Sequence, residues 1–135
     1  MIPDLTGQRT AITAALETLE DLWVYPAAPT GSLPAQFVLI GMPAWSPPAE
    51  AVCMPTIEWQ IMVCHSRSSN ASASALALEG LWPQVLEVLD SQIEQDASWG
   101  GLCATSHLEG AEFNIATIQG IDIPCYVITL KMQGA

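Results

Sequence analysis

The sequence predicts an α+β fold: a mainly antiparallel sheet with two helices packed on one face and a long proline-rich hairpin loop. Two segments repeat their large apolar side chains every three or four residues, which is the period of an amphipathic helix. Other segments alternate apolar and polar residues or form short apolar runs, as strands do. The expected order is a helix, two strands, a helix and two or three strands, and the 135 residues make one domain.

The first helix is expected over residues 4–23. Its large apolar residues lie on one stripe: Leu5, Ile12, Leu16, Leu19 and Trp23. Asp4 or Thr6 can cap its first turn, because a short side chain with an oxygen accepts a hydrogen bond from a free backbone N–H there. Residues 25–34 follow with three prolines and one glycine, a composition that excludes a helix or central strand and predicts an extended linker.

Two strands are expected next, joined as a hairpin by a long loop. Residues 37–40 form a short, wholly apolar run that predicts a buried strand. Residues 56–64 alternate, so that one face is dry and the other is wetter. The dry face consists of Ile57, Trp59, Ile61 and Val63, and the wetter face of Glu58, Gln60, Met62 and Cys64. The loop between the strands, residues 42–55, contains four prolines and Trp45.

The second helix is expected over residues 72–95. Its apolar stripe consists of Leu78, Trp82, Val85, Leu89 and Ile93. Pro83 lies inside this helix. Because proline removes a backbone hydrogen bond and clashes with the preceding turn, we expect a kink or a restart there, aided by Gly80.

The last third of the chain predicts β structure. Residues 102–108 alternate after a glycine pair, residues 113–118 fit more than one structure, and residues 120–124 predict a turn. A final strand is expected over residues 125–132. One of its faces carries Tyr126, Ile128, Leu130 and Met132, and the other carries Cys125, Val127, Thr129 and Lys131.

The balance of charged residues limits the classes of function that are possible. Charged residues make up 13% of the chain and hydrophobic residues 50%; Arg9, Arg67 and Lys131 are opposed by 14 acidic residues, for a net charge of −11. This excludes proteins that grip nucleic-acid phosphates, and it argues against an anionic membrane as partner, because both need Lys and Arg. A small domain usually has a surface with about 25–35% charged residues, so this chain is expected to expose apolar area, which favours an obligate assembly partner. A surface rich in Ser, Thr, Gln and Ala is the alternative.

The sequence also predicts the compartment. No window has the about 18 uninterrupted apolar residues that a membrane-spanning helix needs. The N-terminus, MIPDLTGQRT, has neither the basic start nor the apolar core of a signal peptide, so we expect the protein to stay in a reducing cytoplasm. There its four cysteines are expected to remain thiols. They are Cys53, Cys64, Cys103 and Cys125.

We expect no catalytic, metal-binding or cofactor-binding residues, and hence not an enzyme. Cys64 is adjacent to His65 and Cys103 lies shortly before His107, but structural zinc sites use tight pairs such as C-x2-4-C. On a strand, Cys103 and His107 lie about 13 Å apart, too far to share one zinc ion. The serines after His65 are typical of turn and capping positions rather than of a nucleophile.

The five tryptophans divide into two groups. Trp23, Trp59 and Trp82 lie on the expected apolar stripes, so we assign them to the core. Trp45 lies in a proline-rich loop and Trp99 before a glycine pair, and Trp is enriched at interface hot spots. For Trp45, contact with a neighbouring subunit and packing on its own core remain equal alternatives.

The elements follow one another in a distinctive order. An amphipathic N-terminal helix leads into Val24-Tyr25-Pro26 and a proline-rich linker, followed by a strand hairpin with a long loop. The Trp59 strand, a long helix and a final strand introduced by Gly120-Ile121-Asp122-Ile123-Pro124 complete the pattern. This arrangement resembles the tail terminator, or tail completion, proteins of long-tailed bacteriophages and the related small neck proteins of the head–tail connector. Pro83 inside the long helix departs from the pattern of that family.

The resemblance implies a structural virion protein: a hexameric ring that caps the tail tube and joins it to the neck, with no catalytic residues. Its partners are then copies of itself, the tail tube protein and a neck or stopper protein, with no membrane. DNA passes through such a ring, and a strongly acidic protein suits that role because it does not hold phosphates.

Subunit contacts in this family come from the sheet and from extended loops, which correspond here to residues 26–34 and 42–55. The interface residues that we assign are Tyr25, Leu33, Trp45, Pro47, Pro48 and Trp99. A stopper or adaptor ring of the neck is the alternative within the same class. A small cytoplasmic thiol enzyme or small-molecule-binding protein that uses Cys64, His65 or Cys103 is the alternative from another class.

Overall fold

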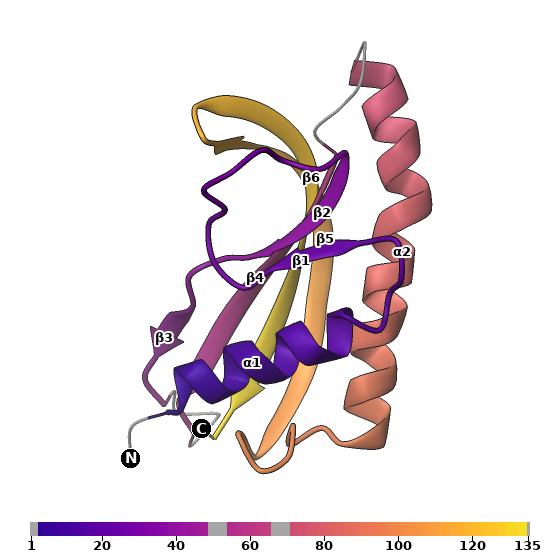
Figure 1. The fold of residues 1–135 in the computed structure, drawn as a ribbon. Helices are drawn as coiled ribbons and strands as arrows, with labels where there is room; N and C mark the ends of the chain where they lie inside the picture. The colour runs from indigo at the N-terminus through magenta and orange to yellow at the C-terminus, as the bar shows by residue number, and fades with distance from the viewer. Residues whose placement is uncertain (1–2, 49–53, 66–70, 135) are drawn as a thin grey trace.

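A computed structural model describes residues 3–48, 54–65 and 71–134 of the chain. Within these ranges, two helices and six strands follow one another (Figure 1). The helices are α1 (Leu5–Leu16) and α2 (Ala71–Gln95). The strands are β1 (Trp23–Tyr25), β2 (Gln36–Ile40), β3 (Ala44–Ser46), β4 (Thr56–His65), β5 (Thr105–Ile118) and β6 (Ile121–Gln133).

The strands form one sheet with both helices on the same face, which confirms the predicted α+β class (Figure 1). The strand order is β1-β2-β4-β6-β5, and β3 pairs with the part of β4 that lies beyond the end of β2. β1 and β2 are parallel, and the other pairs in the described ranges are antiparallel. β3 and β5 therefore lie toward opposite edges of the sheet.

α1 is shorter than the predicted helix over residues 4–23. Asp4 caps it as predicted, since its carboxylate accepts a hydrogen bond of 2.9 Å from the N–H of Gly7. The helix ends at Leu16. Trp23, which was assigned to the core stripe, begins β1 instead and is 66% exposed, so that assignment is wrong. The physical reason is the parallel pairing of β1 with β2, a tertiary contact that overrides the helical period.

α2 runs without interruption through Pro83, so the expected restart is absent. Pro83 and Gly80 lie on the exposed side of the helix, where water can bond to the carbonyl that proline leaves free. The side-chain amide of Gln84 also donates a hydrogen bond of 2.9 Å to the carbonyl of Gly80. The opposite side buries the middle of the predicted stripe: Leu78, Val85 and Leu89.

The larger core fills the space between the helices and the sheet. Trp59 of β4 is fully buried at its centre. The strands contribute the faces that alternation predicted, and the core residues of β4 and β6 are Ile57, Trp59, Ile61, Val63, Ile128, Leu130 and Met132. Burial of this set against the helices orients the sheet, because a one-residue slip would turn every side chain to the other face.

A smaller core lies on the opposite, helix-free face. It consists of Phe37, Leu39, Cys64, Ile118, Ile123 and Cys125. Tyr25 and Leu33 pack against it from β1 and from the linker between β1 and β2. Gln119, at the tip of the β5–β6 hairpin, donates hydrogen bonds of 2.9 Å to the linker carbonyls of Pro29 and Gly31. The extended linker predicted from its prolines thus covers this second core.

The β5–β6 hairpin is longer than predicted. β5 begins at Thr105, later than expected, and includes residues 113–118, whose structure the sequence left open. The turn is confined to Gln119 and Gly120, whose φ angles of 55° and 75° lie in the left-handed region that glycine adopts freely. The turn predicted over residues 120–124 is therefore wrong beyond Gly120, because β6 starts immediately after it.

The proline-rich segment of residues 42–55 lies partly outside the described residues, which omit residues 49–53 and with them Cys53. Its first half contains β3, in which Trp45 pairs with Ile57 of β4. The sequence did not predict β3, because three residues are too few to show a period. The predicted antiparallel pairing of the strands on either side of this segment, β2 and β4, is confirmed.

Candidate functional site

Apart from two cysteines that face each other across β4 and β6, reactive side chains are dispersed in the described ranges. No three His, Cys, Asp or Glu residues within residues 3–48, 54–65 and 71–134 gather so that they could hold a metal ion. Cys103 is buried, and its thiol lies 3.5 Å from the carbonyl oxygen of Ala97. Burial, with a smaller contribution from the charge of Asp96, raises the pKa of Cys103 to about 11. It is therefore a protonated thiol at neutral pH and not an activated nucleophile.

The Cys64–His65 pair does not form a catalytic unit either. Successive residues of a strand point to opposite faces of the sheet, and Cys64 is buried in the helix-free core. His65 is half-buried at the end of β4, and its Nδ1 makes no hydrogen bond with the residues that the structure describes. His107 is exposed on β5, away from the buried Cys103.

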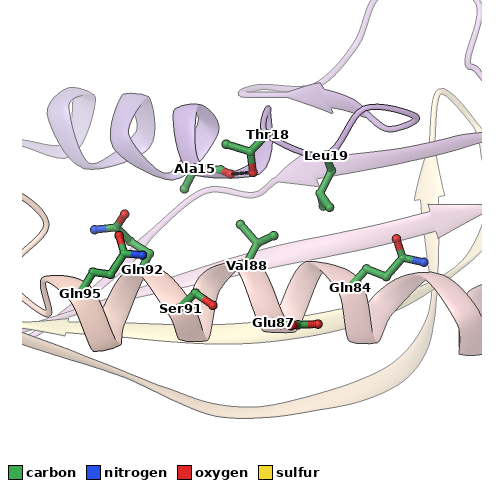
Figure 2. Close-up of a pocket in the computed structure, with 9 residues that line it drawn as sticks. All are labelled: Ala15, Thr18, Leu19, Gln84, Glu87, Val88, Ser91, Gln92 and Gln95. Atoms are coloured by element: carbon green, nitrogen blue, oxygen red, sulfur yellow. Dashed lines mark hydrogen bonds between the residues drawn. The ribbon is translucent and has the colours of Figure 1, made fainter.

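A groove of about 470 Å³ lies between α2 and the end of α1 (Figure 2). Its lining residues are Ala15, Thr18, Leu19, Gln84, Glu87, Val88, Ser91, Gln92 and Gln95. Leu19 and Val88 point into the gap from opposite sides, and Glu87 is the only carboxylate among the lining residues (Figure 2). The groove offers neither a base beside a nucleophile nor a set of metal ligands, so we assign it no chemistry.

The two basic residues in the described ranges are engaged within the molecule. The guanidinium of Arg9 lies 4.9 Å from the centre of the Trp59 ring and donates hydrogen bonds to the carbonyls of Pro26 and Ile40. Lys131 forms an ion pair of 2.9 Å with Glu109, which raises the pKa of the lysine. Arg67 lies outside the described residues. The described surface thus carries no cluster of cations for a phosphate.

Large apolar side chains are the most distinctive feature of the described surface. Those with more than a third of their area exposed are Leu5, Trp23, Met42, Trp45, Leu76, Phe113, Ile115 and Ile121. Met42, in the β2–β3 connection, is 83% exposed and Trp45, in β3, is 57% exposed; the exposed Pro47 and Pro48 come immediately after β3. We call these four residues the Trp45 surface.

A second apolar region lies along β5, at the other edge of the sheet. Phe113 and Ile115, on one face of this strand, are 49% and 59% exposed. Phe113 is held edge-on to Tyr126 at 5.7 Å between ring centres, and Tyr126 stacks on Trp82 of α2 at 5.0 Å. In the described ranges β5 pairs with β6 alone, so the backbone groups of its outer edge have no strand partner. We call Phe113, Ile115 and this edge the β5 surface.

The structure places the six predicted interface residues in different settings. Trp45, with Pro47 and Pro48, is exposed. Tyr25 and Leu33 are half-buried and pack on the helix-free core. Trp99 is 4% exposed, and its indole N–H donates a hydrogen bond of 2.9 Å to Ser106, so its side chain offers almost no surface to a neighbour.

Sequence reasoning missed the β5 surface. Residues 113–118 fit more than one structure because Phe113 and Ile115 alternate with polar or small residues over too short a stretch. The available signal was the pairing of an aromatic with a β-branched residue at alternate positions, which is typical of a strand face. Their exposure depends on β5 being an edge strand, a property of the topology.

Neither helix in the described ranges is both long and apolar enough to cross a membrane. Comparisons of the chain with protein-family models and with curated proteins gave no match. The fold and the described surface together define an α+β domain with two exposed apolar regions.

Proposed function

We propose that the protein is a structural subunit of a bacteriophage virion. It assembles with copies of itself into a ring, expected to be hexameric, that caps the tail tube and joins it to the neck, which is the role of a tail terminator. The observation that carries the proposal is the exposure of large apolar side chains toward two opposite edges of one sheet. The resemblance in element order and proline-rich segments supplies the virion context.

Two different surfaces at opposite edges favour a closed ring over a two-fold dimer. In a two-fold dimer one patch meets its own copy, whereas a ring requires contact between one patch and a different patch on the next subunit. The Trp45 surface and the β5 surface satisfy this requirement, because β3 and β5 lie on opposite sides of β4 and β6. Exposed apolar patches of this kind typically mark interfaces.

The electrostatics support a ring through which DNA passes. Each subunit carries a net charge of −11, and both basic residues of the described ranges are bonded internally. A channel wall of this composition repels phosphates and does not hold them. The raised pKa of Cys103 and the placement of Cys64 and His65 on opposite faces of β4 argue against the thiol-enzyme alternative.

The experiment that tests the proposal disables each surface in turn. Trp45→Glu and Phe113→Glu each place a charge on one of the two surfaces, and Leu76→Glu, at an exposed apolar residue of α2, is the matched control. We expect rings from the wild type and the control by native mass spectrometry and negative-stain imaging. Each surface variant alone should stay monomeric, and a mixture of the two should give heterodimers, since each keeps the surface that the other lacks.

Binding to isolated tail tubes tests the virion role separately. A ring that binds one end of the tube identifies a terminator, whereas a ring that binds only the neck identifies a stopper or adaptor. A protein that stays monomeric up to hundred-micromolar concentration and also on isolated tubes and necks contradicts the proposal.

A further inference from the structure

Cys64 and Cys125 are direct partners across the two central strands, β4 and β6. Both side chains are fully buried in the helix-free core, and both are free thiols. Neither takes part in the surfaces proposed to assemble the ring, so the chemistry of this pair is independent of that function.

The backbone ladder shows which kind of position the pair occupies. The N–H of Gly134 donates a hydrogen bond of 2.9 Å to the carbonyl of Pro55, which makes these two residues a hydrogen-bonded pair. From there the register runs without a shift to the Cys64–Cys125 pair. Hydrogen-bonded and non-hydrogen-bonded pairs alternate along an antiparallel ladder, and Cys64 lies an odd number of residues beyond Pro55. The two cysteines therefore form a non-hydrogen-bonded pair.

That position suits a disulfide. Opposed Cα atoms in non-hydrogen-bonded pairs lie about 4.5 Å apart, with their side chains close together. The Cα atoms of disulfide-bonded cysteines lie about 4.4–6.8 Å apart, so the pair falls inside the permitted range, at its short end. A bond between the two sulfur atoms requires rotation of two side chains and little movement of either strand.

The two thiols differ in pKa. Interaction with the Cys125 thiol, together with burial, raises the pKa of Cys64, whose Sγ donates to the carbonyl oxygen of Met62 at 3.7 Å. The interaction with Cys64, and then the backbone N–H of Ala116, lower the pKa of Cys125 against the opposing effect of burial. Cys125 is accordingly the thiol that ionises first, and a thiolate is the attacking species in thiol–disulfide exchange.

We propose that Cys64 and Cys125 are a reversible disulfide site, oxidised by a low-molecular-weight disulfide and gated by the linker between β1 and β2. The thiolate of Cys125 attacks one sulfur of glutathione disulfide, which forms a mixed disulfide and releases one glutathione thiolate. Cys64 then gives up its proton and attacks the Cys125 sulfur, and the second glutathione leaves. The two cysteines lose two electrons, the glutathione disulfide gains them, and the thiolates released take up the protons.

The gate is the chain segment that covers the pair. Leu33 of the linker packs on the core that contains both cysteines. The two hydrogen bonds from the Gln119 amide to Pro29 and Gly31 hold that linker to the hairpin tip. Exchange needs contact between a reagent and a sulfur that is 0% exposed, so the linker must lift first. Loss of the Gln119 amide should make lifting more frequent.

The test is the equilibrium of the wild-type protein in glutathione buffers, with peptide mapping to identify the linkage. The equilibrium constant for forming the Cys64–Cys125 bond is measured in buffer, where the chain is folded, and in 6 M guanidinium chloride, where it is unfolded. The ratio of the two constants shows how much better the folded chain aligns the two cysteines. We expect the bond to be favoured at least about tenfold more in the folded chain, and the oxidised protein to melt at a higher temperature. A ratio of one or less, or linkage of either cysteine to another partner instead, overturns the proposal.

Two variants sharpen the result. Cys64→Ser should stop the reaction at the mixed disulfide on Cys125, which identifies Cys125 as the attacking thiol. A mixed disulfide found in Cys125→Ser and not in Cys64→Ser reverses the assignment.

Gln119→Ala tests the gate. It should speed oxidation of the pair several-fold while Cys103, which lies outside this core, reacts with iodoacetamide at an unchanged rate. Equal rates of oxidation in Gln119→Ala and wild type show that the linker is not the gate.

Discussion

The indole N–H of Trp59 donates a hydrogen bond of 2.9 Å to the side-chain oxygen of Gln8, which is fully buried on α1. The amide nitrogen of Gln8 donates in turn to the carbonyl of Leu102 at 3.2 Å. One buried amide thus links α1, the central strand β4 and the segment that leads into β5. A buried polar group is stabilising only while it is satisfied, so this link fixes how α1 lies on the sheet.

Replacement of this amide tests the link. Gln8→Ala leaves the Trp59 N–H and the Leu102 carbonyl without their partner, and we expect the free energy of unfolding to fall by about 1–3 kcal/mol. Guanidinium denaturation followed by tryptophan fluorescence measures it. Gln95→Ala, at an exposed glutamine of α2, should change the free energy by less than about 0.5 kcal/mol. Equal losses in both variants contradict the assigned role of Gln8.

Replacement of Trp45 separates an effect on assembly from an effect on folding. The side chain is 57% exposed, so Trp45→Ala should leave the melting temperature of the monomer almost unchanged. The same change should weaken self-association by about 1–3 kcal/mol, the usual range for an aromatic anchor at an interface. Thermal melting of the monomer and an assembly titration give the two numbers. A large loss of melting temperature with normal assembly shows that Trp45 serves its own fold.

The hydrogen bonds of Asp96 predict that the stability of the fold depends on pH. Hydrogen bonds from the Ser98 hydroxyl and from the N–H groups of Gly100 and Ser98 lower the pKa of Asp96 from its ordinary 3.8. The pKa of Asp96 is lower in the folded than in the unfolded chain. The ionised carboxylate therefore stabilises the fold fully at pH values above the ordinary pKa of 3.8, and this stabilisation is lost as the pH falls below 3.8 and through the pKa of the folded state. We expect Asp96→Asn to melt at a lower temperature at neutral pH and to show a smaller loss between neutral pH and pH ~3 than the wild type. Parallel slopes for the two proteins contradict the assignment.

Salt should strengthen assembly. Subunits that each carry a charge of −11 repel one another, and an increase in salt from ~0.01 M to ~0.1 M shortens the screening length from about 30 Å to about 10 Å. Sedimentation velocity at several salt concentrations should therefore show tighter association at higher salt. Weaker association would mean that ion pairs hold the subunits together.

Duplex DNA should not bind to the protein at ~100 mM salt, since cation-poor proteins release few counterions.

Local pattern was enough to predict much of the fold. The alternation around Trp59 and around Ile128 identified both central strands and their buried faces, because each strand has one face toward the helices. The period around Val85 identified the long helix. These segments are long enough for their period to appear, and the packing of the whole molecule agrees with it.

The remaining errors arise from tertiary contacts that no short window contains. Trp23 continues the stripe of α1 but pairs with β2. Cys64 lies on the face predicted to be wetter, yet it is buried in a second core that other strands and Leu33 of the linker help to build. Of the candidate interface, Trp45 is exposed although it lies in β3, whereas Trp99 is buried in the larger core with its N–H bonded to Ser106. Interface contacts themselves depend on a second molecule, so they remain predictions.

The pairing of β4 with β6 has a consequence for the order of folding. It joins the middle of the chain to residues near its end, whereas β5 and β6 are joined by a turn of two residues. Contacts between distant residues form late because the loop between them must close first. During synthesis the Trp59 strand therefore has no central partner until residues 121–133 have emerged from the ribosome. Until then the edge of β4 that faces β6 has unpaired backbone N–H and C=O groups, and an unpaired edge of this kind exposes a nascent chain to aggregation.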